Sequence, residues 1–395
     1  NKLYKGKIFV GYQYRFHPII KKSAELLKNH SLGSIISARF KNAEHLPDWH
    51  PYEDYRESYA SRKKLGGPIP ARVFDDSPLK KPSLEHFKKY LDGSGEKKIS
   101  TTMTFVRLMT DLIKDKNIGD RIVPIVPDEA RTFGMEALFR QIGIYSSEGQ
   151  KYQPEDADQV MWYKESKEGV MLEEGITEAG AFSAWLALAT SYANYNLPMI
   201  PIYLFYSMFG FQRIHDLAWA AGDSQARGFL IGATSGRTTL NGEGLQHQDG
   251  HSHLLSATIP NCLSYDPAFG YELSVITRHG IEEMYYKRKK VFYYLTITNE
   301  NYIQPSQPKG SDEGIIKGIY CLEKEKSPAV KLVGSGAILN ESIKAKEMLK
   351  EFRIKVPFMQ GMLEAVMNRA NSKAVSYTHL RAHETRGNLV CRLLL

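Results

Sequence analysis

Two neighbouring acids in the segment PDEARTFGME, residues 127–136, could take part in chemistry. Asp128 and Glu129 directly follow an apolar run and precede a helix-like stretch. Carboxylates at a helix N-terminus are stabilised by the helix dipole, and a ligand site is expected at the same place. Capping of the helix by Asp128 explains the pattern equally well. The spacing therefore leaves a functional and a capping role open.

Glu178 is an acid in the first turn of an otherwise apolar helix predicted over residues 177–194. The small residues Ala179, Gly180 and Ala181 beside it would let another group approach closely. A carboxylate in apolar surroundings would have a raised pKa and could exchange a proton with a nitrogen base. The pattern alone favours the simpler role of a glutamate that stabilises the helix dipole.

Three aromatic residues, Tyr203, Tyr206 and Phe209, recur every three positions at the end of a predicted strand. They could wall a flat heteroaromatic ring, although burial in an ordinary core is commoner for aromatic side chains.

A glycine-punctuated loop, SGRTTLNGEGLQHQDGHSH, covers residues 235–253 and is long enough to be functional by itself. Its residues His247, Asp249, His251 and His253 resemble a metal cluster. No glutamate follows His247 in the HExxH manner, so histidines facing a substrate are favoured over zinc. Solvated loop histidines explain the pattern equally well.

The elements that must position these residues alternate between short β-branched runs and helix-like segments. Strands are predicted at 121–126, 199–205, 228–234 and 291–298, and helices near 133–141, 177–194, 211–221 and 270–287. This alternation predicts an α/β fold with a doubly wound parallel sheet that is buried on both faces. Ligands of such sheets bind beyond the carboxyl ends of the strands, where the candidate residues lie.

Charge and composition exclude several classes of function. The net charge of +8 is concentrated at the two ends, because residues 68–350 hold 32 lysines and arginines against 35 aspartates and glutamates. We therefore expect no nucleic-acid partner. The absence of a long apolar run predicts no transmembrane helix and no membrane partner. Three widely spaced cysteines without a CxxC motif indicate a reducing, cytoplasmic setting.

The motifs ISTTMTFVRLM, VPDEARTFGMEALFRQIGIY, LPMIPIYLFYSMFGFQRI, SGRTTLNGEGLQHQDGHSHL, IPNCLSYDPAFGYE and NENYIQP follow one another in this order. From about residue 67 to 350 the chain thus resembles the decarboxylating component of the pyruvate dehydrogenase complex, of the homodimeric bacterial type. The resemblance implies a thiamine-diphosphate-binding fold. It places a linker and short helix at 67–98, the pyrimidine-binding domain at 99–307, and the start of a truncated C-terminal α/β domain at 308–350.

The resemblance also implies roles for particular residues. Glu178 corresponds to the acid that contacts the ring nitrogen of the aminopyrimidine, and His247 to the histidine that faces the substrate. The other implied site residues are the acidic pair Asp128 and Glu129, the aromatic pocket of Tyr206 and Phe209 with Arg213 close behind, and Glu243 in the His247 loop.

The implied reaction decarboxylates pyruvate and reductively acetylates the lipoyl group on the lipoyl domain of dihydrolipoyl acetyltransferase, with thiamine diphosphate as electron sink. The full-length family also uses Mg²⁺, held with the diphosphate on an N-terminal domain that bears a GDG…N motif. Because that motif does not occur here, we predict no metal site in this chain.

The two ends of the chain depart from this resemblance. Residues 1–66 resemble part of a Gfo/Idh/MocA-type NAD(P)-dependent oxidoreductase, whereas residues 351–373 match neither pattern. Residues 374–395 resemble a translated adapter tail, so 351–395 are expected to be unmatched and artefact-like. The leading hypothesis is a fragment of the decarboxylating enzyme within a chimeric chain. The alternatives are an oxidoreductase of the Gfo/Idh/MocA kind and an inactive chimeric product.

Overall fold

The computed structural model describes Glu25 and residues 79–127, 130–153, 164–236, 245–323, 332–352 and 358–361. Residues 1–70 and 71–395 form two compact units, and every described residue except Glu25 belongs to the second unit. The expectations for residues 1–66 and 374–395 therefore lie outside the described residues, apart from Glu25.

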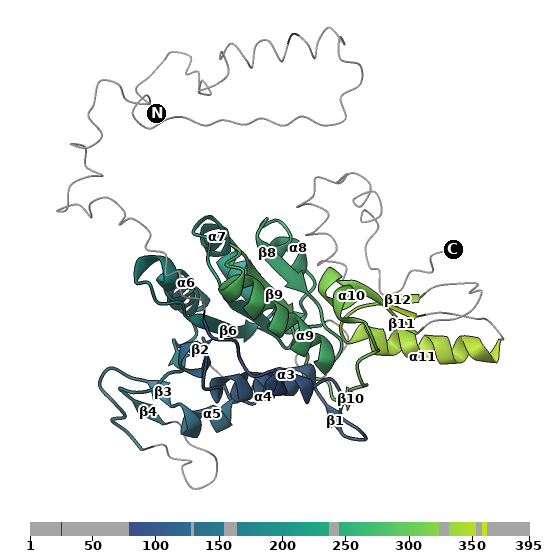
Figure 1. Cartoon of the computed structure of the whole chain (residues 1–395), viewed down its shortest axis with the longest axis horizontal. Coiled ribbons are helices and arrows are strands. Elements are labelled where there is room, and N and C mark those ends of the chain that lie inside the picture. The colour runs from purple at the N-terminus through teal and green to yellow at the C-terminus, as the bar shows by residue number, and fades with distance from the viewer. Residues whose placement is uncertain are drawn as a thin grey trace, which may run out of the picture. The chain divides into compact units, whose positions relative to one another are not determined.

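A six-stranded parallel sheet lies at the centre of the second unit, with strand order β5-β2-β6-β7-β9-β8 (Figure 1). The strands are β2 (Ile122–Val126), β5 (Leu172–Glu173), β6 (Ile200–Tyr206), β7 (Phe229–Ala233), β8 (Cys262–Tyr265) and β9 (Phe292–Thr296). The four predicted strands are all present, and the prediction of a parallel α/β fold is confirmed. Strands β5 and β8 were not predicted, because both are too short to produce a clear hydrophobic run.

Helices cover both faces of this sheet. One face packs on α4 (Thr101–Ile113), α5 (Glu136–Gln141) and α9 (Gly270–Ile281), and the other on α6 (Glu178–Asn194), α7 (Gly210–Asp223) and α8 (Ser252–Ser256). Along β6, Ile202 and Leu204 join the first core, whereas Tyr203 and Phe205 join the second. Successive side chains of a strand point to opposite faces, so an apolar run without alternation is what a sheet covered on both faces requires.

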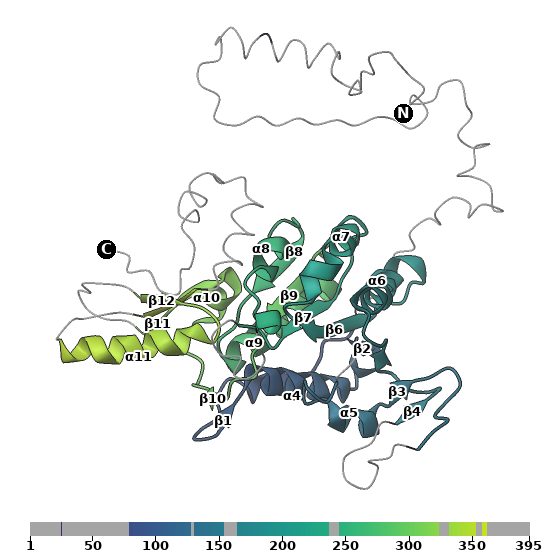
Figure 2. The same cartoon turned by 180° about the vertical axis from the view of Figure 1, so that it is seen from behind.

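Smaller elements flank the sheet (Figures 1 and 2). They are α3 (Glu85–Lys88), the antiparallel pair β1 (Lys98–Ile99) and β10 (Tyr302–Ile303), and the parallel pair β3 (Ile144–Tyr145) and β4 (Glu165–Ser166). Toward the C-terminus come α10 (Asp312–Lys317), α11 (Ile338–Glu351) and a sheet of β11 (Ile319–Glu323), β12 (Leu332–Gly334) and β13 (Phe358–Gly361). The strand–turn–helix unit predicted at 329–350 corresponds to β12 and α11. In the described part of the chain, no helix is long and apolar enough to cross a membrane.

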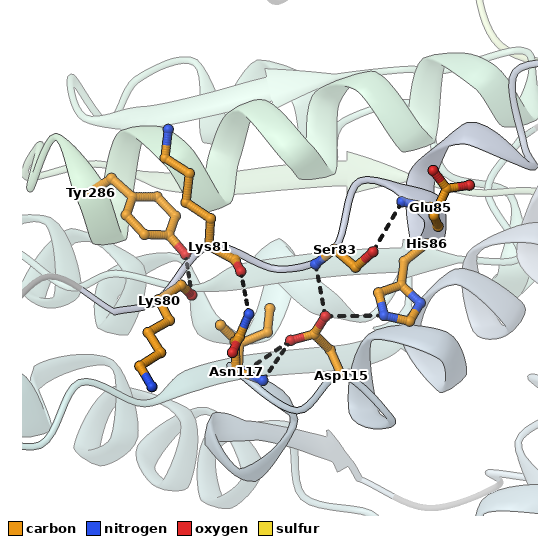
Figure 3. A network of polar contacts seen from close by, with 9 residues as sticks. Lys80, Lys81, Ser83, Glu85, His86, Asp115, Asn117 and Tyr286 are labelled. Carbon is orange, nitrogen blue, oxygen red and sulfur yellow. Dashed lines mark hydrogen bonds and ion pairs between the residues drawn. The ribbon is translucent and has the colours of Figure 1, made fainter.

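The segment that precedes α4 is tied to the turn that follows α4 (Figure 3). The Asp115 carboxylate accepts a hydrogen bond from the Ser83 amide at 2.8 Å, lies 3.0 Å from Nε2 of His86, and also accepts from two amides of its own turn. Burial alone would raise the pKa of Asp115, but these hydrogen bonds and His86 outweigh burial and lower it. The Tyr286 hydroxyl donates to the Lys80 carbonyl at 2.6 Å, so the start of this segment is tied to residue 286 as well.

Glu272, in the first turn of α9, is fully buried beneath β11. Its carboxylate accepts hydrogen bonds from the amides of Ala268 and Phe269, at 2.7 and 2.9 Å, and from the Tyr320 hydroxyl at 2.8 Å. Burial raises the pKa of Glu272 to about 7, although these hydrogen bonds act in the opposite direction.

We expect Glu272 to make the stability of the fold pH-dependent. The folded protein holds this proton up to about pH 7, whereas an ordinary glutamate loses it near 4.5. The stabilisation is therefore complete below pH 4.5 and is lost as the pH rises through 7, by about 3 kcal/mol. Urea unfolding at pH 5 and pH 8 should show this loss in the wild type but not in Glu272→Gln, which resembles the protonated acid.

Glu168→Gln, on an exposed turn, serves as the control and should keep the wild-type pH dependence. An equal loss of stability in the wild type and in Glu272→Gln would contradict the assignment to Glu272.

Candidate functional site

Four aromatic rings gather where β6 ends at the carboxyl edge of the sheet. The Tyr206 ring centroid lies 6.0 Å from that of Phe209 and 5.2 Å from that of Phe133. The His247 ring lies 5.2 Å from Tyr206 and 5.3 Å from Phe209, edge-on to both. We call Phe133, Tyr206, Phe209 and His247 the aromatic cluster. The structure thus brings together three residues that the sequence analysis selected from two separate motifs.

Tyr203 does not belong to this cluster, and of the two roles that the sequence left open for it the structure shows burial in the core. It is fully buried on the opposite face of β6, against Phe182 and Phe205. The reason is strand geometry, because residues three apart in a strand point to opposite faces. Its hydroxyl lies 3.3 Å from the Glu178 carbonyl, and burial together with the nearby Glu178 charge raises the pKa of Tyr203.

Glu178 lies at the start of α6, where the Thr177 hydroxyl caps the helix by accepting the Gly180 amide at 3.2 Å. Its side chain is 9% exposed and binds Arg213, with Nη1 2.5 Å from Oε1, whereas the Arg213 side chain is 49% exposed. The expectation of purely apolar surroundings is therefore wrong. The pattern around Glu178 could not show that α7, 35 residues later, supplies a guanidinium.

Arg213 connects the Glu178 carboxylate with the aromatic cluster. Its guanidinium carbon lies 4.6 Å from the centroid of the Phe209 ring, four residues earlier. Gly210 permits this arrangement, because a Cβ at this position would lie 2.0 Å from the Phe205 ring and would prevent α7 from starting there. An acid, a cation and a set of rings therefore follow one another along the carboxyl edge of the sheet.

Asp249 holds the His247 segment against the sheet. Its carboxylate accepts hydrogen bonds from the Ser207 hydroxyl and from the amides of His251 and Ser252, at 3.0 and 3.1 Å. Ser252 in turn donates to the Ser207 carbonyl at 3.0 Å. Burial alone would raise the pKa of Asp249, but these hydrogen bonds outweigh burial and lower it. Asp249 is thus an ionised, buried anchor that positions His247.

The histidines that looked like a metal cluster have separate roles. His253 Nε2 lies 2.9 Å from the Thr296 hydroxyl, which donates to Asp266 at 2.6 Å, so Nε2 is the donor to Thr296. His251 is exposed. Across the described ranges, no three histidine, cysteine, aspartate or glutamate side chains are placed to hold a metal ion.

Three predicted site residues, Asp128, Glu129 and Glu243, lie outside the described residues, so their roles stay predictions. The sequence analysis did not select Phe133 or Ser207, and it gave Asp249 a different role. Phe133 had a usable signal, because it follows the acidic pair closely after a strand end. Ser207 had none, because a serine next to a strand end is common.

This arrangement fits a flat nitrogen heterocycle better than a metal or a phosphate. The rings offer apolar walls, and the carboxylate could accept a hydrogen bond from a ring nitrogen. Because the Arg213 side chain is half exposed, it could leave Glu178 to a ligand without breaking the core.

Comparison with known proteins identifies the family. The family model described as "Pyruvate dehydrogenase E1 component middle domain" matches residues 80–305. This chain belongs to that family. The E1 components of Pseudomonas aeruginosa and Escherichia coli K12 are each 58% identical to it, over 321 and 302 residues. These matches cover 80% and 75% of this chain but only 36% and 34% of the relatives, so the chain spans about a third of their length.

Solved structures agree with the fold of this E1 family member. A transketolase from Leishmania mexicana aligns with a TM-score of 0.57 at 16% identity, covering 77% of this chain and 39% of that one. The transketolase from Campylobacter jejuni aligns with a TM-score of 0.55 at 17% identity, covering 71% and 38%. The chain therefore has a transketolase-like fold, as expected for a thiamine-diphosphate-dependent family.

Proposed function

We propose that this chain supplies the pyrimidine side of a thiamine-diphosphate site in a pyruvate dehydrogenase component of the acetyl-transferring type. One observation supports this most strongly: Glu178, Arg213 and the aromatic cluster lie next to one another in space along the carboxyl edge of the sheet. Parallel α/β sheets bind their ligands at this edge.

In this proposal the residues bind, orient and exchange protons. Glu178 holds a proton at the ring nitrogen of the aminopyrimidine. This role suits a nearly buried carboxylate that would lie within hydrogen-bond distance of that nitrogen. Arg213 leaves the carboxylate when the ring arrives, and Tyr206 and Phe209 then enclose the ring and exclude water. His247 faces the substrate from the position set by Asp249. The roles of Asp128, Glu129 and Glu243 rest on the family resemblance.

Thiamine diphosphate, when bound, supplies the nucleophilic carbon and the electron sink for removal of carbon dioxide from a 2-oxo acid. We propose pyruvate as that acid and the lipoyl domain of dihydrolipoyl acetyltransferase as the acetyl acceptor, within a cytoplasmic homodimer. The diphosphate and Mg²⁺ would be held by a part of the family's enzyme that this chain does not match. Two further points also stay predictions. They are the domain bounds at 98–99 and 307–308 and the origins of residues 1–66 and 374–395.

Thermal melting of the full chain tests the cofactor proposal. Both thiamine and thiamine diphosphate should raise the melting temperature, because a ligand that binds only the folded state stabilises it by mass action. At a ligand concentration of about a hundred times Kd, this stabilisation is about 2.7 kcal/mol.

Inorganic pyrophosphate is the matched control, since it carries the phosphates without the pyrimidine. A shift that pyrophosphate reproduces in full, with none from thiamine, would contradict a pyrimidine site.

A further inference from the structure

A cavity of about 650 Å³ opens at the N-terminal end of α4, beside β1 and β10. The loop that carries Arg131 and Phe133 closes another side of it. This volume lies in the range of small-molecule sites, about 300–1,000 Å³. The proposed function uses none of these lining residues except Phe133, whose ring also contacts Tyr206.

The charge that lines this cavity is positive. Lys97, Lys98 and Arg107 line it, and none of the three forms an ion pair with the residues that the structure describes. Lys89 also lines it but is bound to Asp111. Among the described residues that line it, none is an aspartate or a glutamate. An anion would therefore find several cations here and no repelling carboxylate from the described lining.

The cations of the lining are within reach of a ligand. The side chains of Lys97, Lys98 and Arg107 are exposed, and all three line the cavity. A ligand could therefore bind them without any movement of the core.

We propose that this cavity binds a small organic phosphate ester. Phosphate oxygens are strong acceptors, and they would pair with the cations of Arg107, Lys97 and Lys98. Met103, which is partly exposed, provides apolar surface for the organic part. This inference does not depend on the proposed thiamine site, since it rests on other polar groups.

Isothermal titration of the full chain with phenyl phosphate, a probe with one phosphate and one apolar ring, tests this site. Arg107→Gln should weaken binding about tenfold, the loss of about 1.4 kcal/mol of a charge-assisted contact. Lys98→Gln, which removes a second cation of the lining, should weaken binding about fivefold. Arg140→Gln, at an exposed position outside the cavity, should bind as the wild type does.

The site would be excluded if phenyl phosphate gave no saturable binding, or if all four proteins bound it equally. Hexaglutamate provides the competing ligand class. If it bound more tightly than phenyl phosphate and with the same dependence on Arg107 and Lys98, the cavity would be a peptide site and the phosphate-ester assignment would be wrong. Melting with thiamine tests the proposed function separately, because thiamine carries no phosphate.

Discussion

Glu178→Gln should lower by about 1,000-fold the rate at which the chain catalyses proton exchange at the thiazolium C2 of thiamine diphosphate. A decrease of this size lies within the range for loss of a general acid–base group. Glutamine keeps the size of the side chain and can still bind a ring nitrogen, but it cannot take up and return a proton. The measurement is deuterium exchange at the thiazolium C2 of added thiamine diphosphate, followed by NMR in the presence of the full chain.

The fold should survive the Glu178→Gln substitution. Its partner Arg213 is half exposed, so loss of the ion pair should lower stability by about 1 kcal/mol or less. Glu174→Gln is the matched control, because Glu174 is an exposed acid four residues before Glu178. This variant should catalyse the exchange at the wild-type rate. Equal exchange in wild type and Glu178→Gln would remove Glu178 from the proposed mechanism.

Asp249→Ala should destabilise the protein by about 4 kcal/mol, because it deletes a buried carboxylate that accepts hydrogen bonds from Ser207, His251 and Ser252. Hydrogen bonds to charged groups contribute about 1.5–3 kcal/mol each, and they are not additive within one network. Urea unfolding measures the loss.

His247 should move when this anchor is removed. The rings of Tyr206 and Phe209 lie 5.2 and 5.3 Å from the His247 ring and should shift its ring-proton signals in NMR spectra. In Asp249→Ala these signals should approach the values of an exposed histidine. Asp216→Ala, at an exposed position on α7, should change neither the stability nor the His247 signals. Unchanged His247 signals in Asp249→Ala would show that Asp249 does not position this residue.

The stabilisation that the Asp249 hydrogen bonds provide depends on pH. Because its hydrogen bonds lower the pKa of Asp249, the stabilisation is complete above the ordinary value of 3.8 and is lost as the pH falls through the lower folded value. Asp249 and Glu272 therefore have opposite effects on the pH dependence of stability, since the contribution of Glu272 is lost as the pH rises.

Local pattern was enough to predict the central sheet. Strands buried on both faces read as continuous apolar runs, and this made 121–126, 199–205, 228–234 and 291–298 recognisable as strands of a parallel sheet. The rule that ligands bind at the carboxyl edge then led to Tyr206, Phe209 and the loop that carries His247, whereas the role of Glu178 came from the family resemblance. Pattern failed where an element was too short, as for β5 and β8, and it left two roles open for Tyr203 because the strand period of two was not applied.

The α/β class, the edge of the sheet where a site is expected, and several of the side chains near that edge could all be predicted from the residues alone. How those side chains contact one another depends on the packing of the folded chain. The pairing of Glu178 with Arg213 and the bonding of Asp249 to Ser207 join residues 35 and 42 positions apart. Such contacts depend on how α6, α7 and the His247 segment pack around β6. Periodicity encodes which face of an element is buried, but it does not encode which distant polar group that face meets.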